Sequence, residues 1–192
     1  MSEFLIKLAK AFPKGSIKQT RYLILPFSMI SLAVAWFYSD LSTIEKGIWV
    51  LSSGLTWTLL EYILHRWLLH YPAKSEVGKV ILARLHVIHH DHPEDGSQVC
   101  VPMLLSAPLW LMIYGLIVLM GGGSTTSWLF VSGVAVMMTF YDSVHYFTHY
   151  ETAKTRYGKF LKKHHMLHHF KDDTVRYGVT SPLWDYFFHT YR

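Results

Sequence analysis

His86-Val-Ile-His89-His90 returns about eighty residues later as His165-Met-Leu-His168-His169. Both copies read His-x-x-His-His, and positions i, i+3 and i+4 share one face of a helix, so each copy is expected to direct three imidazoles at a single point. Four further histidines stand in two more spaced groups: His65, His70, His145 and His149. Ten histidines in four groups indicate a metal site, and their number favours a site for two ions.

The composition is that of a membrane protein. The chain has 192 residues, which predicts one domain over residues 1–192, and it is 51% hydrophobic with a net charge of +5. A hydrophobic chain with excess Lys and Arg is expected to face anionic lipid. The basic residues lie between apolar runs and not along one polar element, which disfavours a nucleic-acid partner. Cys100 is the only cysteine, so nitrogen and oxygen must hold any metal.

Four apolar stretches are each near the ~20 residues that a helix needs to cross a bilayer. They cover residues of about 22–38, 47–64, 101–120 and 127–146. Before them, residues 1–21 alternate apolar and basic side chains. This pattern is typical of an amphipathic segment on the membrane surface, or of a flexible basic tail.

The loops predict the orientation of these crossings. Of the 18 Lys and Arg residues, only Lys46 falls in the links after the first and third stretches. The positive-inside rule therefore makes both termini cytoplasmic and also places all 13 histidines at the cytoplasmic side. We expect an all-α, multi-pass integral membrane protein of the endoplasmic reticulum or a bacterial inner membrane. Its crossings form two hairpins, and residues 65–100 and 147–192 form a cytoplasmic helical cap. A soluble helical bundle is the alternative.

The spacing within the shorter histidine groups carries two further predictions. His65 and His70 are five residues apart, about 140° on a straight helix, so they do not share a face unless the helix changes. Pro72 disfavours helix at Tyr71, which predicts that the helix unwinds near His70 and lets that side chain turn back. His145 and His149 are at i and i+4 and can bind one ion together.

The ligand set suits an oxidative centre. Two ions with about five ligands each would use all ten histidines. No Glu has a His three residues later, as soluble di-iron bundles require, and no His-Glu-x-x-His protease motif is present. Imidazole suits Fe, Zn, Cu and Ni alike. A redox-active pair beside an apolar interior favours iron that uses O2 on a lipid C–H bond, although zinc can occupy such a site in isolated protein.

The same residues carry a resemblance to a known family. The sequence resembles the fatty acid hydroxylase superfamily, and within it the fatty acid 2-hydroxylases. The resemblance rests on these stretches: His-Arg-Trp-Leu-Leu-His at 65–70, His-Val-Ile-His-His-Asp-His-Pro-Glu-Asp-Gly-Ser at 86–97 with Pro102, His-Tyr-Phe-Thr-His at 145–149, His-Met-Leu-His-His-Phe at 165–170 and Tyr-Gly-Val-Thr-Ser-Pro-Leu-Trp-Asp-Tyr-Phe-Phe-His-Thr at 177–190. They cover most of the chain from residue 60 onward.

The resemblance implies a function and a ligand set. It implies a four-crossing membrane enzyme with a cytoplasmic dimetal cap that hydroxylates, with O2, the carbon next to an acyl carboxyl. The acyl chain would belong to a free fatty acid or to an N-acyl sphingolipid, and all ten histidines fall on family ligand positions. Eukaryotic relatives often carry a cytochrome b5 domain, whereas about twenty residues precede the first crossing here. A separate cytochrome b5- or ferredoxin-type reductant is therefore expected to supply electrons.

Several other polar residues are candidates for roles beside the metals. Asp142 can orient a ligand imidazole or hold a metal-bound water, or it is an acid at the membrane interface. Tyr141 is a proton donor at the metal or a belt aromatic. Asp185 is expected to brace the cap through a histidine or a backbone turn, and Glu61 to support the site or form a salt bridge. Of the remaining histidines, His92 and His164 are expected beside the ligands or at the surface, and His189 contacts substrate or packs.

Other functions stay open on the sequence alone. The same framework could hydroxylate a sterol or carotenoid, or desaturate a chain. A haem electron carrier would place paired histidines inside the membrane, whereas these lie at its surface. A metal transporter would need polar ligands deep in the membrane, where Glu61 is almost the only candidate.

Overall fold

The computed structural model describes residues 14–192, and in that range the chain forms helices and no strand. The surface segment predicted for residues 1–21 therefore lies mostly outside the described residues. The last part of this predicted segment is continuous with the first crossing and not separate from it. Residues 17–21 already belong to the first long helix, which begins at Ile17 and ends at Tyr38.

Four long helical stretches make up the body of the molecule. The first contains α2 (Ile17–Gln19), the π-helical segment η1 (Thr20–Ile24) and α3 (Leu25–Tyr38). The second contains α4 (Thr43–Ile63) and the π-helical η2 (Leu64–Leu69). The third is α7 (Met103–Leu119) and the fourth is α8 (Ser124–Tyr150). A capping box between Ser42 and Glu45 starts α4, because each side chain bonds the backbone N–H of the other residue.

Three of these stretches are long and apolar enough to cross a membrane: Ile17–Tyr38, Thr43–Leu69 and Ser124–Tyr150. Each extends beyond the limits predicted from hydropathy, because the polar residues at the ends continue the helix. The apolar part of α7, Ser106–Leu119, is shorter. The all-helical fold class is therefore confirmed together with three candidate spans, and the fourth crossing stays a prediction.

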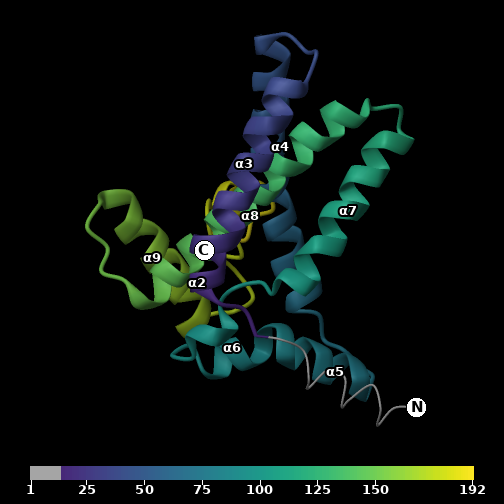
Figure 1. Ribbon diagram of the computed structural model, residues 1–192. Coiled ribbons are helices and arrows are strands. Elements are labelled where there is room, and N and C mark those ends of the chain that lie inside the picture. The colour runs from purple at the N-terminus through teal and green to yellow at the C-terminus, as the bar shows by residue number, and fades with distance from the viewer. Residues whose placement is uncertain (1–13) are drawn as a thin grey trace.

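Most of the shorter helices gather at one end of the body. The shorter helices are α5 (Glu76–Leu82), the π-helical η3 (Ala83–Val87), α6 (Ile88–Asp91), the 3-10 segment η4 (Gly96–Gln98), α9 (Arg156–Phe170) and α10 (Leu183–Phe187). In Figure 1, α5, α6 and α9 lie at the lower end, and the turns that join α3 to α4 and α7 to α8 lie at the upper end. Two helical hairpins thus point away from the end that carries the histidines.

Helix α8 is the centre of the packing. Gly133 faces Ser53 of α4 so closely that a Cβ at position 133 would overlap the serine side chain. On another side of α8, Ser132 and Ser31 hydroxyl oxygens lie 2.8 Å apart. Small residues at such contacts let helix backbones approach closely, which is the usual means of helix association in membranes. α8 also carries His145 and His149, so this packing positions the site.

Candidate metal centre

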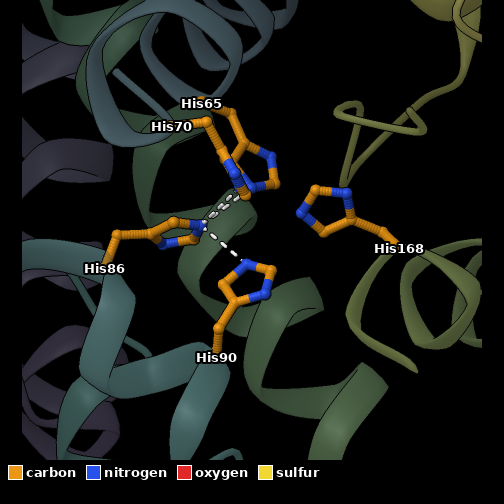
Figure 2. Close-up of side chains that lie close together, drawn as sticks. All are labelled: His65, His70, His86, His90 and His168. Carbon is orange, nitrogen blue, oxygen red and sulfur yellow. Dashed lines mark hydrogen bonds between the residues drawn. The ribbon is translucent and has the colours of Figure 1, made fainter. Parts of the chain in front are cut away.

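The structure brings the ten histidines of the four sequence motifs together in two groups of five. In each group one nitrogen per residue lies within 4.8 Å of all the others. We call them the first group (His65, His70, His86, His90 and His168) and the second group (His89, His145, His149, His165 and His169). Figure 2 shows the imidazoles of the first group converging from three parts of the chain.

The expectation that each His-x-x-His-His copy serves one point is wrong. His86 and His90 point into the first group, whereas His89 belongs to the second. The second copy divides the other way, with only His168 in the first group. The reason is angular: i and i+4 differ by about 40° on a helix, but i+3 and i+4 differ by about 100°. Each motif therefore spans both groups and holds them side by side.

The route by which His70 reaches the first group also differs from the prediction. The helix does not unwind before His70. It widens into the π-helical η2, and the His70 N–H donates to the His65 carbonyl at 3.2 Å, an i to i+5 bond. A π-turn brings residues five apart onto one face, so both imidazoles approach His86.

The nitrogen distances fit a cation better than they fit hydrogen bonds. His86 Nε2 lies 3.0 Å from His65 Nε2, 3.1 Å from His70 Nε2 and 3.0 Å from His90 Nε2. One imidazole nitrogen carries either one proton or one lone pair, so it cannot satisfy three such neighbours. Two ligands at right angles, each about 2.1 Å from one ion, would lie about 3.0 Å apart. The donor set therefore fits a metal ion.

The second group has the same character. His89 and His145 Nε2 atoms lie 3.0 Å apart, and His165 Nε2 lies 2.9 Å from that of His149 and 3.1 Å from that of His169.

In the first group, the buried Nε2 of His168 has no hydrogen-bond partner among the described residues. A buried polar atom without a partner is costly, and a bound cation would remove that cost.

Backbone carbonyls fix three of the imidazoles. Nδ1 of His65 lies 2.6 Å from the Tyr177 carbonyl, Nδ1 of His168 lies 2.7 Å from that of Val175, and Nδ1 of His145 lies 3.1 Å from that of Val99. A proton on Nδ1 donates in each case, which leaves Nε2 as the free ligand atom. These carbonyls were not predicted, because carbonyl partners leave no residue-type signal in a sequence.

The histidines of the two groups that lie on the shorter helices are held neutral. Burial lowers the pKa of His90 to about 4 and that of His168 to about 3. Burial, together with the neighbouring imidazoles His65 and His90, also lowers the pKa of His86 well below its usual value. Neutral imidazole is the form that binds a metal, so the site is prepared for a cation at neutral pH.

The two groups are in direct contact. The rings of His90 and His169 stack with centroids 4.1 Å apart and an angle of 18° between their planes. One ring belongs to the first group and the other to the second. Both groups therefore form one continuous centre.

Asp185 braces the loop that carries the carbonyl partners. Its carboxylate accepts from His164 Nε2 at 3.1 Å and from the backbone N–H groups of Tyr177 at 2.8 Å and Gly178 at 2.9 Å. It also accepts from the Thr190 hydroxyl at 2.8 Å. These bonds lower the pKa of Asp185 although its burial acts to raise it. Asp185 thus positions the Tyr177 carbonyl, which in turn orients His65.

Glu61 holds the same loop from the other side. One carboxylate oxygen accepts from the Val179 N–H at 3.1 Å and the Thr180 N–H at 2.9 Å, and the other accepts from the Thr180 hydroxyl at 2.8 Å. No ion pair to Glu61 is present among residues 14–192. Of the two roles considered for Glu61, the structure therefore favours support of the site.

Asp142 and Tyr141 take different places beside the second group. Asp142 accepts from the Thr20 hydroxyl and from the Val101 N–H, both at 3.1 Å, and so ties the first helix and the loop before α7 to α8. Within residues 14–192, the hydrogen bonds of its carboxylate do not include a histidine. The Tyr141 ring packs 5.6 Å from that of His145 and 5.8 Å from that of Trp57.

The three remaining histidines lie outside both groups. His164 is buried against Asp185, with its ring stacked 5.4 Å from that of Tyr191. His92 is exposed and lies 3.3 Å from a Glu94 oxygen. His189 is also exposed, with a positive φ of 57°.

An apolar cavity of about 300 Å³ opens against the centre. His86 and His145 form part of its wall, one from each group. Trp57, Leu64 and Met138 supply part of its apolar wall. A mostly apolar pocket with a few polar groups at one end is typical of a site for an apolar ligand. These wall residues could not be predicted from the sequence, since apolar residues in a candidate span look alike.

Fold and site together define a class: a helical membrane protein whose histidine-rich centre borders an apolar cavity. The chain belongs to the fatty acid hydroxylase family, because the model of that family matches residues 50–190. It is 38% identical over 150 residues to the dihydroceramide fatty acyl 2-hydroxylase FAH2 of Arabidopsis thaliana, and 34% identical over 147 residues to the fatty acid 2-hydroxylase of Rattus norvegicus. The predicted resemblance is thereby confirmed.

The chain spans only part of the length of these relatives. The alignments cover 76% of this chain and 61% of the Arabidopsis protein, and 75% of this chain and 39% of the rat protein. A solved structure described as full-length scs7p with only its hydroxylase domain visible is 27% identical, with a TM-score of 0.84 over 94% of this chain and 68% of that one. The histidine groups indicate a metal-binding member of this family, and the apolar helices indicate a membrane protein.

Proposed function

We propose that this protein hydroxylates the carbon next to the carboxyl or amide of a lipid acyl chain, with two histidine-bound metal ions and O2. The acyl chain belongs to a fatty acid or to an N-acyl sphingolipid. One observation carries the proposal: His86 and His145, one from each group, form part of the wall of the apolar cavity. An acyl chain in that cavity would lie against both parts of the centre.

The relatives support the choice of position. Their names describe hydroxylation at carbon 2 of a fatty acyl chain, in one case that of a dihydroceramide. Iron at the two groups would supply the oxidising chemistry, and a separate cytochrome b5- or ferredoxin-type protein would supply electrons. In purified protein, zinc can take the place of iron at imidazole ligands.

The chain's own residues would orient the substrate and keep water away. Trp57, Leu64 and Met138 exclude water from the chain beyond the reacting carbon. The three backbone carbonyls keep Nε2 of His65, His145 and His168 directed at the ions. Tyr141 lines the cavity beside His145, where its hydroxyl can hold a proton close to the reacting end. Asp185 and Glu61 keep the supporting loop rigid.

The topology is part of the proposal. Four crossings, with α7 as the third, place both ends of the chain and both histidine groups on the cytoplasmic side. This proposal is supported by the charge distribution, because only one of the 18 basic residues falls in the two links predicted to face the opposite side.

Lipid analysis and metal content test the function. The full chain is expressed with a reductant system, and its lipids are compared by mass spectrometry with those of cells that express a His86→Ala, His145→Ala variant. We expect 2-hydroxy acyl chains only with the unchanged chain, and two irons per chain after anaerobic purification. A new double bond or an altered sterol as the product, or protein that holds one metal or none, would refute the proposal.

A further inference from the structure

The carboxy-terminal residues 177–191 differ in charge from the rest of the predicted cap. They contain no Lys or Arg, and their one acid, Asp185, is buried and fully paired. Basic residues stand directly on either side, at Arg176 and Arg192. Seven basic residues lie between residues 154 and 176. The run of basic residues therefore ends at Arg176, where this segment begins.

This segment packs along α4. The Trp184 indole N–H donates to the Thr58 hydroxyl at 3.1 Å, and the hydroxyl oxygens of Tyr62 and Thr190 lie 2.9 Å apart. The Phe188 ring stacks on Tyr62 with centroids 5.1 Å apart. In Figure 1 the yellow end of the chain runs back among the long helices. Contact therefore reaches from the histidine end of α4 to Thr58.

Thr58 and Tyr62 lie inside the membrane for every placement of this helix that lets it cross. A crossing needs about 20 residues. Within Thr43–Leu69, the first window of about that length ends near residue 62 and the last begins near residue 50. Residues 50–62 are common to all such windows. A segment that packs against Thr58 and Tyr62 therefore lies at the depth of the hydrocarbon layer.

The outward face of the segment matches this depth. In α10, Leu183 is 48% exposed and Phe187 is 68% exposed. Lipid-exposed backbone without hydrogen-bond partners is not tolerated in hydrocarbon, and here Glu61 and Asp185 accept from four N–H groups of residues 177–180. Both carboxylates are themselves buried, and their oxygens accept these hydrogen bonds.

We propose that residues 181–188 form a re-entrant element that inserts Leu183 and Phe187 among the acyl chains of the leaflet nearer the histidine groups. The segment is part of the membrane domain and not of a water-facing cap. The insertion anchors the Tyr177 loop, and with it His65, to the bilayer. This placement does not depend on which lipid is oxidised.

Phe170 provides a matched control for Phe187. It is the same residue type and is 70% exposed, against 68% for Phe187. Unlike Phe187, it is followed by three charged residues, Lys171, Asp172 and Asp173. Leu51, 77% exposed in the middle of α4, serves as the lipid-facing reference.

The test places a bimane fluorophore on single cysteines at these positions in the full chain, reconstituted in phosphatidylcholine nanodiscs. Buried Cys100 stays in place, and the unchanged protein gives the labelling blank. We expect acyl-brominated phosphatidylcholine to quench the label of the Phe187→Cys and Leu51→Cys variants. Aqueous iodide should not quench the label at these two positions. The Phe170→Cys label should show the reverse. Iodide quenching at position 187 as strong as at 170, or quenching by neither agent, would overturn the proposal.

Discussion

Replacing Asp185 by Asn tests how the loop supports the first histidine group. Each Asp185 oxygen accepts two hydrogen bonds, from Tyr177 N–H and the Thr190 hydroxyl on one, and from Gly178 N–H and His164 on the other. An Asn amide replaces one oxygen by a donor, so two of the four buried donors lose their acceptor. Each buried donor left without a partner costs about 1–3 kcal/mol. The substitution should therefore destabilise the protein by about 2–6 kcal/mol.

The loss should appear in both stability and metal content. At about 2–4 °C per kcal/mol for a chain of this size, the unfolding midpoint in detergent should fall by at least about 4 °C, as followed by circular dichroism. Because the Tyr177 carbonyl orients His65, the first group should lose metal while the second keeps it, so about one ion per chain remains by elemental analysis. Asp172→Asn is the control, since Asp172 is exposed and, within residues 14–192, its side chain accepts hydrogen bonds only from Thr174.

The pH dependence gives the effect a sign. The pKa of Asp185 is lowered in the folded protein, so its carboxylate stabilises the fold above the unfolded pKa of about 3.9. That stabilisation is lost as the pH falls through the folded pKa. The unfolding midpoints of the unchanged protein and the Asp185→Asn protein should then converge. If the Asp185→Asn protein unfolds at the same temperature as the Asp172→Asn protein and keeps both ions, the bracing role is wrong.

Three further outcomes are expected. His86→Ala should remove the ion of the first group and abolish product, measured as metal per chain and 2-hydroxy lipid, whereas His92→Ala, with its exposed side chain, should change neither. Leu64→Trp should fill the cavity and lower product without loss of metal, and Leu55→Trp, on the lipid-facing side of the same helix, should not. The metal-free protein should lose thermal stability as pH falls from about 6.5 to about 4, because burial depresses the folded pKa of His90 and so favours neutral imidazole; a flat profile would contradict this.

Much of the centre could be predicted from the sequence because it depends on residue type. Ten histidines at helical spacing on one predicted side of a membrane had few other arrangements open to them. Their division into two groups was harder to predict. The pattern His-x-x-His-His places its last two imidazoles about 100° apart on a helix. The helix angle pairs the first residue of each motif with the last, but His86 and His90 join the first group whereas His165 and His169 join the second. Which group each pair joins depends on where the partner helices lie, and the sequence of the motif does not encode its neighbours.

The supporting contacts could not be predicted for a different reason. Tyr177, Val175 and Val99 act through backbone carbonyls, which every residue carries. The partners of Glu61 are backbone N–H groups more than a hundred residues away. Such contacts follow from the path of the chain after the helices have packed.

The π-helical segments show why a membrane setting shapes this centre. The segments η1 and η2 lie at the histidine-side ends of two candidate spans, and η3 contains His86. Inside hydrocarbon a helix cannot open into an unpaired loop, because every backbone polar group must be satisfied. A π-turn changes the direction of side chains while the backbone stays hydrogen-bonded. A straight α-helix through η2 would turn His70 about 140° from His65 and leave the first group one ligand short.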